Sequence, residues 1–509
     1  MKAFTEPLLS LAGFEEMTKT AEKSSGLISV TGCIDAQKSQ MIYAFGGHRK
    51  NKLIVTFGEQ KAKELYEEYS FFDKEVVYYP SKDVLFYQSD IRGNLLTAER
   101  IRALKAIREK ESVTLVITFD ALMNTMAPIE KMWENVLTLE QGQLLDLKGI
   151  QAALIRMGYE KEYQVQTMGQ FSVRGGILDV FPLTEENPIR IELWGDEIDT
   201  IRFFDCESQK SIENTDSVSI YPAAELVLSD EEKAGGIEKL RAEAKRVSDK
   251  LRKQMKTEEA HRVTVMADEL TEEWGELSMY AGMDAFLSYF FDERVGLLDY
   301  FNPSDSLIFF DELTRCTEQG KLTETEFSES MKQRLAMGYI LPGQMNGLFT
   351  EKEIVAKLEK YSCIALGALD NKANGLHQLG SYGIHCQSVS PYNNSFELLI
   401  KDLKRYKKNG YRVILLSGSR TRAKRLSEDI TDQGITCFYT ENYDHELSEG
   451  QIMVCYGKVR RGFEYPILKF AVITESDIFG AQQKKKKRHR TYEGEKIQSF
   501  TDLSVGDYV

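Results

Sequence analysis

The residues best suited to chemistry follow the first apolar run of the chain, where a phosphate-binding loop would lie. Such a loop reads GxxxxGK[ST]: its glycines let backbone N–H groups approach the phosphates, its lysine neutralises charge, and its Ser or Thr holds Mg²⁺. Gly32, Lys38 and Ser39 fit this pattern, but Gln37 replaces the second glycine. A side chain at that position should obstruct the close approach of the backbone. We therefore interpret the loop as a vestigial nucleotide site; a live ATPase that tolerates Gln37 is the alternative.

A later apolar run ends in an acidic pair. The sequence LIFFDE at 307–312 resembles a Walker B strand, in which Asp311 would reach Mg²⁺ through water and Glu312 would activate the attacking water. A buried strand that ends in exposed acids is the ordinary alternative in α/β proteins. Because the phosphate loop is altered, the pair indicates descent from an ATPase, and we predict no catalytic residue in this chain.

Neither a metal site nor a membrane segment is predicted. The 7 cysteines and 6 histidines are dispersed, without CxxC or paired Cys/His spacing, which argues against zinc and fits a reducing cytosol. No apolar run reaches the roughly 18 residues of a membrane span. The N-terminal residues do not have the pattern of a signal peptide. We expect a cytoplasmic protein that holds no metal and no cofactor.

The net charge of −14 argues against a protein that binds DNA over most of its surface, since phosphate contacts require positive charge. Basic residues concentrate locally, at 401–425 and at 484–490. We interpret the first group as a solvated helix face and the second as part of an extended linker. Nucleic-acid contact is the alternative for both groups. The charge balance favours a protein partner.

Strands and helices alternate in the first part of the chain. Four short runs rich in apolar and β-branched residues, LISVTG, KLIVTF, EVVYYP and VTLVITF, begin at residues 27, 52, 75 and 113. Segments with helical spacing separate them, and this alternation is typical of a parallel, doubly wound sheet. We assign residues 1–130 to the first part of an α/β domain.

The pattern changes near residue 131. Closely spaced short strands with glycine-containing turns predict a small α+β unit at 131–225 with antiparallel pairing. Residues 226–375 are helix-rich and include one buried strand, so we expect them to complete the first domain. The remaining predicted units are a second α/β domain, a basic linker and the first strand of another domain, at 380–479, 480–498 and 499–509.

One segment, 171–209, carries a specific resemblance. Its runs RGGILDVFP and RIELWGDEIDTIRFFD resemble the UvrA-binding domain shared by UvrB and the transcription-repair coupling factors. The resemblance extends over essentially the whole chain, to the terminal VGDYV, which resembles the opening of an RNA-polymerase-interacting domain. Two departures favour the coupling factors over UvrB. The phosphate loop is altered, and the chain after the third strand turns almost directly into a helix, leaving little room for the DNA-clamping hairpin of UvrB.

The resemblance also implies a binding site. Arg174 in SVRGG, Arg190 in NPIRIE and Trp194 in IELWG fall where the family contacts UvrA. Such a cluster suits an interface, because arginine binds carboxylates bidentately and aromatic rings supply buried anchors. The alternative is that two of the three only cap a sheet surface. We interpret the nearby Gly175, Gly176 and Asp179 as turn and packing residues.

The implied architecture is a degenerate UvrB- and helicase-like nucleotide-binding fold with an inserted α+β UvrA-binding domain, followed by the second α/β domain. The implied role is that of an adaptor in transcription-coupled nucleotide-excision repair: the N-terminal half of the factor that recognises stalled RNA polymerase and recruits UvrA. The ATP-dependent DNA translocase, with its ATP and Mg²⁺, would lie in another part of the protein. We therefore expect a truncated chain that lacks the motor and binds DNA weakly. A UvrB-like protein that binds ATP and damaged DNA is the alternative.

Three basic residues of the second α/β domain, Lys458, Arg460 and Arg461, lie near where a helicase second lobe would place arginine fingers. Because no intact nucleotide site is predicted for them to complete, we expect no catalytic role for these residues.

Overall fold

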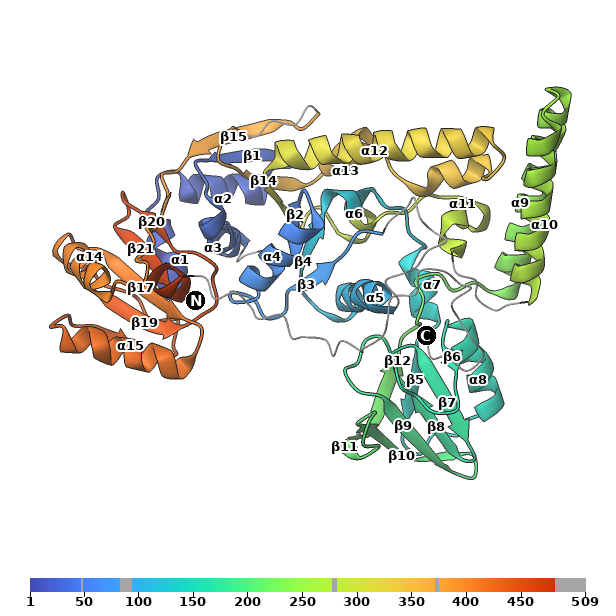
Figure 1. The fold of residues 1–509 in the computed structure, drawn as a ribbon, viewed down its shortest axis with the longest axis horizontal. Coiled ribbons are helices and arrows are strands. Elements are labelled where there is room, and N and C mark those ends of the chain that lie inside the picture. The colour runs from blue at the N-terminus through green and yellow to red at the C-terminus, as the bar shows by residue number, and fades with distance from the viewer. Residues whose placement is uncertain (47–48, 83–93, 277–281, 371–374, 481–509) are drawn as a thin grey trace, which may run out of the picture.

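The computed structural model describes residues 1–46, 49–82, 94–276, 282–370 and 375–480 (Figure 1). The segment in which the UvrB hairpin would lie is mostly outside these ranges, as are the predicted linker after Gly480 and the predicted last strand. Within the described ranges no helix combines the length and the apolar character that crossing a bilayer requires.

The main sheet has seven parallel strands in the order β15-β1-β14-β13-β2-β4-β3. Its strands are β1 (Gly26–Thr31), β2 (Asn51–Thr56), β3 (Val77–Tyr79), β4 (Val113–Thr118), β13 (Ser306–Asp311), β14 (Ser362–Leu366) and β15 (Gln378–Gly383). The predicted parallel α/β sheet is thereby confirmed, with strands far apart in the sequence as neighbours.

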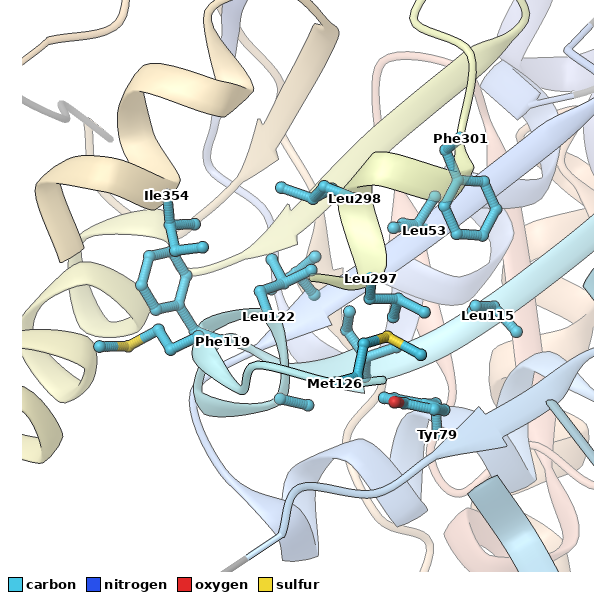
Figure 2. Packing of buried hydrophobic residues seen from close by; sticks show 14 of the residues in the cluster. Leu53, Tyr79, Leu115, Phe119, Leu122, Met126, Leu297, Leu298, Phe301 and Ile354 are labelled. Carbon is cyan, nitrogen blue, oxygen red and sulfur yellow. The ribbon is translucent and has the colours of Figure 1, made fainter. Parts of the chain in front are cut away.

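The central strands of this sheet are buried on both faces, as their nearly continuous apolar runs predict, whereas the edge strand β15 is partly exposed. On β2, Leu53 and Val55 point into one core and Ile54 into the other. The first core (Figure 2) lies under α5 (Asn94–Glu109), α6 (Phe119–Met123), α12 (Leu313–Ala336) and α13 (Glu351–Leu358). The second lies under α1 (Lys2–Leu9), α2 (Phe14–Lys23), α3 (Asp35–Gly46) and α4 (Glu59–Tyr69).

A separate six-stranded sheet is inserted between β4 and β13, in the order β11-β10-β9-β8-β7-β6. It comprises β6 (Glu160–Lys161), β7 (Gln170–Arg174), β8 (Ile177–Val180), β9 (Ile189–Trp194), β10 (Glu197–Phe204) and β11 (Ser211–Thr215). All neighbours are antiparallel except β6 and β7. The β7–β8 turn requires glycine at 175, where φ is +59°, a left-handed value that other residues adopt at a cost.

One face of the inserted sheet is apolar and packs on α8 (Leu147–Arg156). The antiparallel pair β5 (Leu137–Glu140) and β12 (Ser217–Ile220) closes this core at the side. The opposite face of β7 to β10 has no helix of its own in the described chain, and this face carries the predicted UvrA-binding residues.

A helical hairpin follows, made of α9 (Asp230–Lys253) and α10 (Thr257–Glu276), and it projects from the body (Figure 1). Ser229 and Glu232 form a capping box at the start of α9, which satisfies otherwise unpaired helix N–H groups. Shorter elements complete this region and the rest of the chain: α7 (Ile129–Glu134), η1 (Met283–Phe286), α11 (Leu287–Phe290), η2 (Leu297–Tyr300), η3 (Pro342–Gly347) and α16 (Glu475–Phe479).

The C-terminal part of the described chain forms another six-stranded sheet, in the order β16-β20-β21-β17-β19-β18. Its elements are β16 (Gln387–Ser388), α14 (Phe396–Lys408), β17 (Arg412–Ser417), α15 (Arg420–Asp432), β18 (Phe438–Tyr439), β19 (Ile452–Tyr456), β20 (Phe463–Tyr465) and β21 (Phe470–Thr474). Helices α14 and α15 cover one face. The other face, which includes Ile414 and Leu416, packs into the same core as α1 and α4.

A buried ion network joins the inserted sheet to the main body. Arg100 of α5 is fully buried and stacks over the Tyr79 ring at 4.1 Å. Its Nε lies 2.7 Å and its Nη2 3.0 Å from the two carboxylate oxygens of Glu225, which follows β12. Lys82 Nζ lies 3.1 Å from Glu225 and 2.7 Å from Asp284. Two cations and two anions balance, as burial of charge requires.

We predict that Glu225→Gln lowers the free energy of unfolding by about 3–5 kcal/mol at neutral pH, because it leaves Arg100 and Lys82 buried without their shared carboxylate. Although burial alone would raise it, the charges of Arg100 and Lys82 lower the pKa of Glu225 to about 2 from its usual 4.5. The carboxylate's contribution is therefore present above pH 4.5 and is lost as the pH falls toward 2. Urea unfolding should show that the difference in the free energy of unfolding between the variant and the wild type becomes smaller as the pH falls from 4.5 toward 2. The exposed Glu186→Gln is the control, and equal stability of all three proteins at pH 7 would contradict the prediction.

Candidate functional site

The predicted phosphate loop lies between β1 and α3, at the carboxyl edge of the main sheet. The loop and the acidic strand β13 are separated by one strand, β14. This strand order nevertheless brings the side chain of Lys38, in the first turn of α3, to the end of β13. The two parts of the predicted vestigial site, far apart in sequence, are therefore in direct contact.

Lys38 is bound by the acids that would otherwise serve Mg²⁺. Its Nζ lies 2.5 Å from Asp311 Oδ1, 2.8 Å from Glu312 Oε1 and 3.2 Å from Asp35 Oδ1. The side chains of Lys38 and Asp311 are fully buried. Burial by itself would lower the pKa of Lys38, but the charge of Asp311 and the hydrogen bonds to both acids raise it above its usual value. The lysine is thus a permanent internal cation with all three N–H groups engaged.

Asp311 of the acidic pair is buried and Glu312 is only partly exposed, in contrast to the ordinary interpretation of such a strand end. Asp311 is 1% exposed, and its second oxygen accepts a hydrogen bond from Thr56 Oγ1 at 2.9 Å. Glu312 has a left-handed φ of 59°, a conformation that costs free energy for a residue with a side chain. Two contacts hold it there: Lys38, and the backbone N–H of Ala368, which donates to Glu312 Oε1 at 3.2 Å.

Gln37 closes the loop from within. Its side chain is buried, and its Oε1 accepts a hydrogen bond from the backbone N–H of Ile34 at 2.8 Å. The N–H groups of Gly32 and Cys33 donate to the carbonyls of Ala368 and Gly367 at 3.2 and 3.0 Å. Loop N–H groups that a phosphate could use are therefore already paired inside the protein.

Mg²⁺ and a nucleotide do not fit this arrangement. Mg²⁺ prefers about six oxygen ligands, whereas both carboxylate oxygens of Asp311 are engaged by Lys38 and Thr56. Ser39 Oγ is buried without a hydrogen-bond partner in the described chain, but one hydroxyl does not make a metal site. Among the described residues no group of three or more His, Cys, Asp or Glu side chains could hold a metal ion.

The basic residues near the end of β19 do not reach the loop lysine's acids. Arg460 instead pairs with α4, where its Nη1 lies 2.6 Å from Glu64 Oε1. Glu68, also within 4.0 Å of Arg460, is buried deeply enough that its pKa rises to about 7. Arg460 therefore joins the C-terminal sheet to the main body.

The three predicted UvrA-binding residues share the uncovered face of the inserted sheet, where Arg174 and Arg190 come together and Trp194 lies farther along β9. The register pairs Asp179 of β8 with Arg190 of β9. Arg190 Nε and Nη2 lie 2.7 and 2.8 Å from the two carboxylate oxygens of Asp179, and Arg174 Nη2 lies 2.8 Å from the same carboxylate. Asp179 is 1% exposed. The residue interpreted from sequence as a packing residue is thus the anion that positions both arginines.

The two arginines differ in what they present to a partner. Arg190 is 13% exposed, stacks over Phe204 at 4.3 Å and donates a further hydrogen bond to Gln209 at 2.8 Å. Its hydrogen bonds to Asp179 raise its pKa further. Arg174 is 35% exposed and has one carboxylate partner, so several of its donors face solvent. Trp194, at the end of β9, is 84% exposed.

Another ion pair, Arg202 with Glu192, extends this face. Arg202 lies opposite Arg190 in the β9–β10 register, and its Nη2 lies 2.5 Å from Glu192 Oε1. Sequence reasoning missed both residues. The two-residue period of strands could have found them, because residues 190, 192 and 194 must share one face.

The comparisons with known proteins agree with this organisation. The family described as UvrB interaction domain matches residues 137–226, which include the whole inserted sheet. The transcription-repair-coupling factor of Bacillus subtilis is 30% identical over 438 residues, which is 86% of this chain and 37% of that protein. The proteins of the same name from Staphylococcus epidermidis (strain RP62A) and Staphylococcus aureus (strain MRSA252) are 28% and 26% identical over 95% and 97% of this chain.

The chain spans about two fifths of the length of these relatives, from 37% to 42%. The resemblance to transcription-repair coupling factors is thereby confirmed, as is the presence of a UvrB interaction domain.

We predict that Lys38→Met lowers the free energy of unfolding by about 3–5 kcal/mol, because Asp311 would remain buried without its cation. Asp311→Leu alone should also destabilise, because it removes the fully buried partner of Lys38 and leaves this lysine only Glu312 and Asp35. The loss in the free energy of unfolding for the double variant should be smaller than the sum of the two single losses, since the double variant removes both charges together. Urea unfolding of the four proteins measures this coupling. Additive losses would show that the ion pair does not hold the loop, and the exposed Lys19→Met serves as a control with little expected change.

Proposed function

We propose that this chain, a relative of transcription-repair coupling factors that contains a UvrB interaction domain, is an adaptor that binds UvrA in transcription-coupled nucleotide-excision repair. The observation that carries the proposal is the uncovered face of the inserted sheet. There Asp179 holds Arg174 and Arg190, and the exposed Trp194 lies on the same face farther along β9. Because a rigid arrangement loses little entropy on binding, it suits recognition by a protein surface.

The three residues contribute in different ways. Arg174 offers free N–H groups for carboxylates of UvrA, in the bidentate geometry that arginine favours. Trp194 supplies the large side chain that is buried on association, as is typical of residues that dominate interface energy. Arg190 acts mainly by fixing Asp179, because most of its guanidinium is already engaged and covered.

The chain, we further propose, is not an enzyme by itself and needs no ATP or Mg²⁺. The closed loop supports this, since Lys38 and Asp311 bind each other and Gln37 Oε1 accepts a hydrogen bond from the Ile34 backbone N–H. The main sheet with its altered loop would then be a degenerate UvrB- and helicase-like fold that serves as a scaffold. Residues 380–479 would form the second domain of this scaffold.

In the whole protein, we propose, the ATP-dependent translocase and the contact with RNA polymerase belong to other parts. DNA contact by the present chain would then be weak, in keeping with its net charge of −14. We place its action in the cytoplasm.

We predict that Arg174→Ala weakens UvrA binding tenfold or more, which is about 1.4 kcal/mol, with little change in stability, because its pair with Asp179 is partly exposed. Arg190→Ala should weaken binding and also lower the free energy of unfolding by about 3 kcal/mol, because it uncovers the buried Asp179. Calorimetry and urea unfolding separate the two effects. Arg156→Ala, on the opposite side of the same domain, is the control. No binding of UvrA by the folded wild-type chain would remove the proposed function.

We predict that millimolar Mg²⁺–ATP does not change the unfolding temperature of the wild-type chain. A ligand at a hundred times its Kd would stabilise the fold by about 2.7 kcal/mol, so binding would be visible. Gln37→Gly restores the letters of the phosphate-loop pattern, but it should also fail to bind, because Lys38 remains held by Asp311 and Glu312. A nucleotide-dependent shift in the wild-type protein would instead support a live site.

A further inference from the structure

The end of the inserted sheet where Trp194 lies carries a second exposed apolar side chain. Trp194 pairs with Glu197 across the β9–β10 hairpin, and Glu197 forms an isolated antiparallel bridge with Leu144. Directly paired residues point to the same face of a sheet. Trp194, Glu197 and Leu144 therefore form one row across three adjacent segments, with Leu144 two strand spacings, roughly 10 Å, from Trp194.

Both apolar members of this row are open to solvent. Leu144 is 75% exposed and Trp194 is 84% exposed. The backbone beneath them is fixed by hydrogen bonds, from Leu145 N to the Asp196 carbonyl at 2.7 Å and from Ile198 N to the Gln143 carbonyl at 2.9 Å. The two side chains are thus presented from a firm surface rather than from a loose loop.

A groove of about 690 Å³ opens beside Trp194, lined by β10 and the 140–142 segment rather than by β7 and β8, which carry Arg174 and Asp179. Its charged lining residues are Glu140, Glu197, Asp199 and Asp216. No ion pair involving these four carboxylates is found in the described part of the chain, whereas the acids near the arginines, Asp179 and Glu192, are both paired. The side chains along this face consequently change from basic, at the arginines, through apolar, at Trp194 and Leu144, to acidic, in the groove.

We propose that the UvrA-binding surface extends past Trp194 to Leu144 and into this groove, so that UvrA contacts three zones in a fixed order. This proposal rests on the proposed function, and it specifies which kind of UvrA side chain contacts each zone. UvrA would place carboxylates against Arg174, an apolar patch over Trp194 and Leu144, and Lys or Arg side chains in the acidic groove. The charge of this face is positive at one end and negative at the other, which suits a single partner. Charge complementarity at both ends allows that partner only one orientation.

Calorimetry of the whole chain with UvrA tests the extension. Leu144→Ser should weaken binding about tenfold, as expected for the loss of an apolar contact at the centre of an interface. Glu197→Lys should weaken binding about threefold to tenfold, and by less at high salt, because added ions screen its repulsion of a cationic partner group. Matched controls lie far from this face: Met255→Ser, 87% exposed at the connection between α9 and α10, and Glu329→Lys, exposed on α12.

The outcomes are distinguishable. If the wild-type chain does not bind UvrA, the proposed function fails. If the wild type binds and Arg174→Ala weakens binding, but Leu144→Ser and Glu197→Lys behave like their controls, the site ends at Trp194 and the extension is overturned. Weakening by both variants, with unfolding temperatures equal to that of the wild type, supports the three-zone surface.

Discussion

The ion pair between Lys38 and Asp311 is the interaction on which the main body depends. It joins α3 to β13 across the carboxyl edge of the sheet, at 2.5 Å and without solvent. A lone buried charge of either sign would be too costly to keep, so each residue requires the other. The surrounding loop is arranged to complete the pair: Thr56 binds the second oxygen of Asp311, and Glu312 accepts a strained backbone conformation to reach Lys38.

This closure agrees with the proposal that the main sheet serves as a scaffold. In an open phosphate loop the lysine and the backbone N–H groups are free to bind phosphate. Here internal carboxylates and carbonyls occupy those donors, so stability comes without a ligand. The C-terminal sheet packs against α1 and α4 through Ile414, Leu416 and neighbouring side chains, and so shares a core with the main body.

A rigid body matters because the proposed binding face lies on a sheet inserted into it. The network of Arg100, Glu225, Lys82 and Asp284 fixes the end of the insertion to α5 and to the segment after β3. On the face itself the buried carboxylate of Asp179 likewise pairs with two cationic side chains, those of Arg174 and Arg190. Buried anions thus position cations in three places: at the altered loop, at the domain junction and at the surface. The arrangement lets the exposed Trp194 and Leu144 meet a partner without prior ordering.

The sequence by itself determined the parallel α/β sheet, the antiparallel inserted unit and the place of the altered loop. These follow from local patterns: apolar runs of strand length, helical spacing and the single substitution at Gln37. The resemblance around Arg174, Arg190 and Trp194 likewise depends only on letters in order. Only the tertiary structure showed which side chains contact one another. That Lys38 meets Asp311, that Asp179 pairs with the arginines, and that Leu144 shares a row with Trp194 all depend on strand order and register. Those contacts join residues distant in the chain, and only the packing of whole elements brings them together.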